Sequence, residues 1–147
     1  MATVTPLAAL AAALAMAQAP GTCRIRSVTG LAFGAYDPVG ANAAAPLDTT
    51  GQISYTCRTT APLVTLSAGS AGTFNPRLLR SGTATLPYNL YRDAGHAQIW
   101  GDGTGGSFTV TAPAGRRLVL VVYGRIPAGR VARPGSYADT VVATFNF

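Results

Sequence analysis

The chain has 147 residues, enough for one domain with a hydrophobic core and too few for two comfortable ones. Its 11 basic and 5 acidic residues give a net charge of +6, and every one of them is Arg or Asp. Lys and Glu, which favour exposed helix faces, are absent. Because 17 Gly and 10 Pro separate short extended segments, the composition predicts an all-β domain rather than a helical one.

The first twenty residues differ from the rest of the chain. An apolar run of Ala and Leu covers residues 7–16, and two small-x-small sites follow at Ala17 and Ala19. This pattern predicts a signal peptide over residues 1–17, with cleavage after Ala19 as the alternative, and a mature domain over residues 18–147. The apolar run is too short for a membrane-spanning helix. No basic residue precedes it, which departs from the usual signal pattern.

Cys23 and Cys57 are the only cysteines, and both lie in the predicted mature part. Neither belongs to a CxxC motif or a Cys/His cluster, so a metal site is not predicted. In a secreted chain the two cysteines are expected to form one structural disulfide. In the chain-entropy model a bond that closes a loop of this length contributes about 3–4 kcal/mol to the free energy of unfolding.

Short extended runs separated by Gly- and Pro-bearing turns continue through the mature chain. Their number and spacing predict a β-sandwich of about seven strands. The expected strands cover residues 22–33, 51–57, 63–67, 83–91, 107–111, 117–123 and 137–147.

The last of these runs is strongly apolar and alternates with period two. Val141, Ala143, Phe145 and Phe147 fall on one face, and the intervening residues fall on the other. Such a strand must be covered. It is either an ordinary central strand or the border of a groove that receives a strand from another molecule.

Several motifs resemble chemical sites. Residues 101–106 fit GxGxxG, but a strand and not a helix follows them, so a loop is predicted instead of a dinucleotide site. Asp93 and Asp102 lack the spacing of a calcium loop and are expected to be turn carboxylates. The single histidine, His96, has no partner motif and is expected to be an exposed loop residue. No catalytic residue, cofactor site, metal site or small-molecule substrate is predicted, and the protein is not expected to be an enzyme.

The basic residues are spread singly or in pairs, such as Arg24 with Arg26 and Arg116 with Arg117. Without a dense basic run or a known module, nucleic-acid binding is not predicted, and a solvated surface is favoured. The same charge would also suit anionic cell surfaces or polysaccharides.

Five short sequence motifs, which follow one another in a fixed order, indicate the protein family more specifically. They are Leu-Ala-Phe-Gly-Ala-Tyr-Asp at 31–37, Gly-Gln-Ile-Ser-Tyr-Thr-Cys at 51–57, residues 86–93 with Trp-Gly-Asp-Gly at 100–103, residues 122–129, and Pro-Gly-Ser-Tyr-Ala-Asp-Thr-Val at 134–141. Together they resemble the spore coat protein U domain family, which includes the pilin subunits of archaic chaperone–usher pili. The resemblance covers residues 23–147.

This resemblance implies an immunoglobulin-like β-sandwich that lacks its last strand. Such a subunit is secreted to the periplasm, held by a chaperone, and assembled by an outer-membrane usher with other pilus subunits into a surface pilus linked to adhesion or biofilm formation. A strand from a neighbour would then fill the groove, with Val141, Ala143, Phe145 and Phe147 among its walls.

One feature departs from that family pattern. Cleavage after Ala17 leaves only five residues before Cys23, too few for a donor strand. The subunit therefore donates to no neighbour, or keeps the Ala/Leu run, or works outside a polymer. The alternative function is a stand-alone secreted coat or carbohydrate-binding module with a complete fold.

Overall fold

The computed structural model describes residues 2–3, 8–14 and 23–147. The strands are β1 (Ala2–Thr3), β2 (Ala8–Leu14), β3 (Cys23–Thr29), β4 (Ala35–Tyr36), β5 (Leu47–Cys57), β6 (Leu63–Leu66), β7 (Arg77–Ser81), β8 (Ala84–Tyr91), β9 (Val110–Thr111), β10 (Gly115–Ile126) and β11 (Asp139–Asn146). A short 3-10 helix, η1 (Gly69–Ala71), lies between β6 and β7. No helix in this part of the chain is long and apolar enough to cross a membrane.

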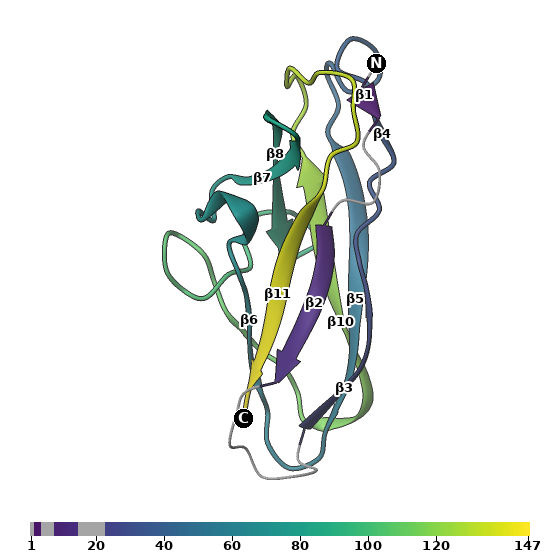
Figure 1. The fold of residues 1–147 in the computed structure, drawn as a ribbon. Coiled ribbons are helices and arrows are strands. Elements are labelled where there is room, and N and C mark those ends of the chain that lie inside the picture. The colour runs from purple at the N-terminus through teal and green to yellow at the C-terminus, as the bar shows by residue number, and fades with distance from the viewer. Residues whose placement is uncertain (1, 4–7, 15–22) are drawn as a thin grey trace.

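The strands form an elongated sandwich of two sheets (Figure 1). One sheet has the order β3-β5-β10-β8-β7, and the other has the order β2-β11-β6-β9. A small separate pair joins β1 to β4. The predicted all-β sandwich is therefore confirmed. Among the named strands of the described residues, β2 and β11 form the only parallel pair.

Several strands differ in length from the sequence prediction. β5 begins at Leu47, four residues earlier than expected, because Leu47 to Thr50 pair with the end of β10. β9 contains only two residues of the predicted run 107–111. β7 was not predicted, because its five residues include Arg77 and Arg80 and lie between Pro76 and Gly82.

The core lies between the inward faces of the two sheets. Ile53, Tyr55 and Cys57 of β5 are fully buried, and so are alternate residues of β11. The ring of Tyr55 packs on that of Phe145, with 5.2 Å between the ring centroids, and so joins the two sheets. The aromatic residues Trp100 and Tyr88 also belong to the core and are each 1% exposed.

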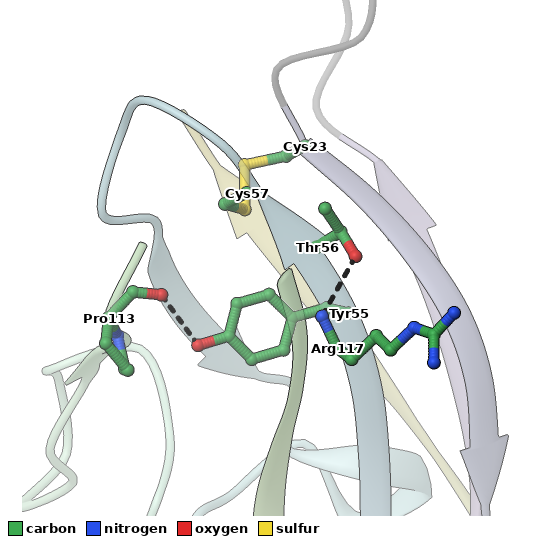
Figure 2. The surroundings of a disulfide bond; sticks show 6 residues. All are labelled: Cys23, Tyr55, Thr56, Cys57, Pro113 and Arg117. Atoms are coloured by element: carbon green, nitrogen blue, oxygen red, sulfur yellow. Dashed lines mark hydrogen bonds between the residues drawn. A yellow bond between two sulfur atoms is a disulfide. The ribbon is translucent and has the colours of Figure 1, made fainter. Parts of the chain in front are cut away.

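The predicted disulfide joins the ends of two neighbouring strands (Figure 2). Cys23 of β3 lies opposite Cys57 of β5, with 4.1 Å between their Cα atoms. Nearby, the Tyr55 hydroxyl donates a hydrogen bond of 2.8 Å to the carbonyl of Pro113. The disulfide therefore joins two neighbouring strands of one sheet, at the end where the chain enters β3 and leaves β5.

Candidate functional site

The last strand, β11, is paired along both of its edges. On one edge it pairs antiparallel with β6, and Phe145 lies opposite Val64. On the other edge it pairs parallel with β2 over seven residues, with Val141 opposite Leu10 and Phe145 opposite Leu14. Figure 1 shows these two strands side by side, β2 in purple and β11 in yellow. The second edge is the candidate site, because among the described strands β2 alone covers it.

The inner face of β11 has the alternation predicted from the sequence. Val141, Ala143 and Phe145 are fully buried, whereas Thr140 and Asn146 are exposed. Phe147 follows the end of the strand, is half-buried and packs against the core. These four residues therefore belong to the core surface beside the β2 position, and their role as walls for a partner strand stays a prediction.

β2 lies at the edge of its sheet and next to β3 of the other sheet. It therefore sits where the sandwich would otherwise be open between β11 and β3. β2 falls within the predicted signal peptide, and both predicted cleavage sites, after Ala17 and Ala19, lie outside the described residues. Removal of residues 1–17 would leave the β11 edge without its strand.

A buried carboxylate holds the first residue of β11 in place. Asp139, 5% exposed, accepts hydrogen bonds from the Tyr88 hydroxyl at 2.5 Å and from the Ser70 amide at 2.9 Å. A Cβ atom on Gly69 would lie 2.2 Å from the Asp139 carboxylate, so only glycine permits this approach. Burial, followed by the hydrogen bond to Asp139, raises the pKa of Tyr88 well above its usual value, so the phenol remains a neutral donor.

A buried arginine fixes the loops that flank β6. Arg77 is fully buried and donates to the carbonyls of Ser67 and Trp100 and to the side chain of Asn89, at 2.7–3.0 Å. Ser67 in turn exchanges two hydrogen bonds of 2.9 Å with Val142 of β11. Burial lowers the pKa of Arg77 to about 10.

Asp139 and Arg77 were not predicted from the sequence as structural determinants. The available signal was alternation, because Arg77 falls on the same face of β7 as the buried Leu79, and Asp139 on the same face of β11 as Val141. A charged residue in a buried register position predicts a satisfied polar network.

The expectation of an exposed His96 is wrong. Its side chain is only 10% exposed, because the ring lies edge-on to the rings of Tyr91 and Tyr123 on the outer face of β8 and β10. Its Nε2 atom lies 3.9 Å from the carboxylate of Asp48. Asp48 also accepts two hydrogen bonds from Arg125, at 2.7 and 2.9 Å, which lower the pKa of that carboxyl below its usual value.

The remaining motifs behave as turn elements. Residues 101–106 form a loop, and Asp102 accepts hydrogen bonds from the amide and hydroxyl of Thr104. Asp93 accepts the amides of Ala97 and Gln98, which shapes the loop that carries His96. In the described part of the chain no three His, Cys, Asp or Glu residues gather as a metal site would require.

A family model described as the Spore Coat Protein U domain matches residues 8–144. The chain belongs to this family. The match begins at Ala8, the first residue of β2, and ends within β11. A relative, "Protein U" of Myxococcus xanthus, is 36% identical over an alignment of 141 residues, which covers 86% of this chain and 78% of that protein.

The fold is also similar to a chain in a crystal structure of the CsuC–CsuE chaperone–tip adhesion subunit pre-assembly complex, from archaic chaperone–usher Csu pili of Acinetobacter baumannii. The TM-score is 0.51 and the sequence identity is 22%, over 85% of this chain. The match covers 39% of the Csu chain, so this Spore Coat Protein U domain spans about two-fifths of its length. At this identity the likeness is one of fold.

Proposed function

We propose that this protein is a secreted structural subunit of a chaperone–usher surface pilus, assembled by donor-strand complementation at the second edge of β11. A periplasmic chaperone would supply the covering strand first, and a neighbouring subunit would replace it at an outer-membrane usher. The pilus would lie at the cell surface and serve adhesion or biofilm formation.

The observation that carries this proposal is the pairing of β2 with β11. Seven residues of an apolar segment lie in register along a strand whose inner face is fully buried. A strand added at a sheet edge gains affinity from main-chain hydrogen bonds and from the apolar face that it covers. The Csu complex named above, a chaperone with a tip adhesion subunit, supports a chaperone as the partner.

The same observation favours a second candidate function. If residues 8–14 remain with the mature protein, the chain covers its own β11 edge. The fold would then be complete without a partner, as expected of a stand-alone secreted coat or carbohydrate-binding module. The family match, which includes β2, supports this alternative.

A thermal melt tests whether the second edge of β11 needs a covering strand, which the pilus-subunit function requires. The measurement compares residues 18–147 alone with residues 18–147 carrying a copy of residues 8–14 after Phe147 on a flexible Gly/Ser linker. An open groove that exposes ~300 Å² of apolar surface forfeits about 7 kcal/mol at ~25 cal/mol per Å². The appended strand should therefore prevent aggregation and raise the Tm by more than about 10 °C.

The matched control is the same appended strand with Asp in place of the residues copied from Leu10 and Leu14, which lie opposite Val141 and Phe145. This strand should rescue little, because a charge at these positions would have to enter an apolar site. A sharp, high melt of the unmodified monomer, unchanged by either appended strand, would rule out the pilus-subunit function. Mass spectrometry of the mature amino terminus separates the two functions if the appended strand does rescue, because a mature protein that keeps β2 covers its own edge and one that lacks β2 needs a partner strand.

A further inference from the structure

Five of the eleven arginines gather at the disulfide end of the sandwich, although they are far apart in the sequence. They come from three neighbouring strands, and all five are exposed: Arg24 and Arg26 of β3, Arg58 directly after β5, and Arg116 and Arg117 of β10. In this region Cys23 lies opposite Cys57, which in turn lies opposite Gly115. We call this group of arginines the basic end.

Two β-bulges place arginines on either side of the same part of β5. In β3 the register shifts between Ile25 and Ser27, which leaves Arg26 as the extra residue. In β10 the register shifts between Gly115 and Leu118, which leaves Arg116 and Arg117 opposite Thr56. Bulges redirect side chains out of the regular pleat. Each of the two bulges therefore contains at least one exposed arginine.

The bulge in β10 holds Arg117 in an unusual backbone conformation. Its φ angle is +53°, a region that costs a non-glycine residue free energy unless the surroundings support it. The Arg117 amide donates to the Thr56 hydroxyl at 3.3 Å, and Figure 2 shows the Arg117 side chain extending away from the Tyr55 ring. An asparagine or glycine would take this conformation at lower cost, yet the position holds a long cation.

None of the five aspartates forms an ion pair with an arginine of the basic end. All five aspartates of the chain lie among the described residues, and both ion pairs found there involve Asp48. Asp48 precedes Thr56 by eight residues along β5, a distance of about 26 Å in an extended strand. This distance exceeds the screening length of about 8 Å at physiological ionic strength. The five exposed guanidinium groups of the basic end therefore form a positive surface in which none of them is held in an ion pair with an aspartate.

The guanidinium groups of the basic end indicate which class of ligand it would bind. The planar guanidinium group matches carboxylate and sulfate groups with two parallel hydrogen bonds. Five such groups across three adjacent strands suit a polymer that carries an anionic group at regular intervals. Of the large apolar residues that are exposed in the described chain, only Val119 lies on β3, β5 or β10. Single-stranded nucleic acids bind by stacking on aromatic side chains, which this surface does not offer.

We propose that the basic end binds an acidic polysaccharide through its carboxylate or sulfate groups. This function is independent of the β11 edge and is compatible with a pilus subunit and with a stand-alone module. The disulfide holds β3 and β5 together between Arg24 and Arg58, so the surface is set before the ligand arrives.

The test uses protein purified from cells that express the full chain, and its probes are heparin, polygalacturonate and duplex DNA. The test variant carries Arg26→Gln with Arg116→Gln, one change in each bulge. The control variant carries Arg130→Gln with Arg133→Gln, two exposed arginines in the segment between β10 and β11. Both variants lose two positive charges, so they differ only in where the charge is removed.

The wild type should bind both polysaccharides more tightly than duplex DNA. The test variant should bind them about fivefold or more weakly, and the control variant should stay within about twofold, since a local contact and not the net charge is removed. Equal weakening of both variants, no binding by the wild type, or preference for DNA would overturn the proposal. If the double variant fails to fold in a thermal melt, the two single substitutions are compared with Arg130→Gln by the same criterion.

Discussion

Arginine has opposite roles in two regions of this domain. Arg77 is fully buried and donates to Ser67, Asn89 and Trp100, so it joins the start of β7 to the loops that support β6 and β11. The arginines of the basic end are exposed and have no ion-pair partner among the described residues. Although the residue type is the same, the first region uses it for stability and the second leaves its charge available.

The two roles differ because folding removes water from the guanidinium group of Arg77 and leaves the guanidinium groups of the basic end hydrated. Burial of a guanidinium group is unfavourable unless hydrogen bonds replace its water, and Arg77 has such bonds to three acceptors. An exposed arginine loses little water and contributes little to folding. Substitution should therefore affect stability in the first region and binding in the second.

The largest expected effect is on stability at Arg77. Arg77→Met should lower the free energy of unfolding by about 3–5 kcal/mol, because it removes the side-chain donor to the buried carbonyls of Ser67 and Trp100 and one of the two donors to the Asn89 side-chain oxygen. Denaturant unfolding followed by tryptophan fluorescence measures the change, since Trp100 lies in this network.

Arg80→Met, on the same strand, is the matched control. Arg80 is exposed and its side chain donates one hydrogen bond of 3.1 Å, to Ser70. Its loss should cost less than about 1 kcal/mol. Equal effects of the two substitutions would mean that burial does not distinguish the two regions.

The next effect concerns the covalent bond at the basic end. Replacing Cys23 and Cys57 together by Ser should lower the free energy of unfolding by about 2–4 kcal/mol, because the bond closes a loop of sequence separation 34. Limited trypsin digestion should also cut faster after Arg24, Arg26 and Arg58, because the ends of β3 and β5 would open more often. Two reactive thiols in the unreduced, denatured wild type would contradict the disulfide itself.

The smallest expected effect concerns the ion pair between Asp48 and Arg125. Its exposure is intermediate between that of the buried Arg77 and that of the arginines at the basic end. Asp48→Asn should cost less than about 1 kcal/mol at pH 7, because the Asp48 side chain is 41% exposed. The hydrogen bonds from Arg125 lower the pKa of Asp48, so its contribution is present above the unfolded pKa of about 4 and is lost as the pH falls through the lower folded value.

The difference in Tm between wild type and Asp48→Asn should therefore shrink as the pH falls below about 4. Arg125→Gln should remove the same pH dependence, and the double variant should show no further loss. A constant difference down to strongly acidic pH would mean that Asp48 acts through packing and not through its charge.

The sequence predicted the parts of the molecule that depend on local pattern. The period-two alternation of β11, the burial of Val141, Ala143 and Phe145, and the β-sandwich class all follow from which residues can leave water together. The disulfide followed from two cysteines in a chain predicted to be secreted. The five ordered sequence motifs were sufficient to predict the family.

Other features could not be read from the sequence, because they depend on contacts between distant segments. The Ala/Leu run of β2 has the composition of a leader, and only its register with β11 identifies it as a cover for that edge. His96 lies in a loop, as expected, but its burial depends on contacts with the rings of Tyr91 and Tyr123, which belong to two neighbouring strands.

The sequence by itself determined which residues alternate, where the chain turns and that the net charge is positive, since these are properties of neighbouring residues. Only the tertiary structure decided where that charge acts. Strand pairing brings Arg24, Arg26 and Arg58 beside Arg116 and Arg117, while it buries Arg77. The physical reason is that hydration and electrostatic interactions depend on distance in space, and folding sets that distance independently of separation along the chain.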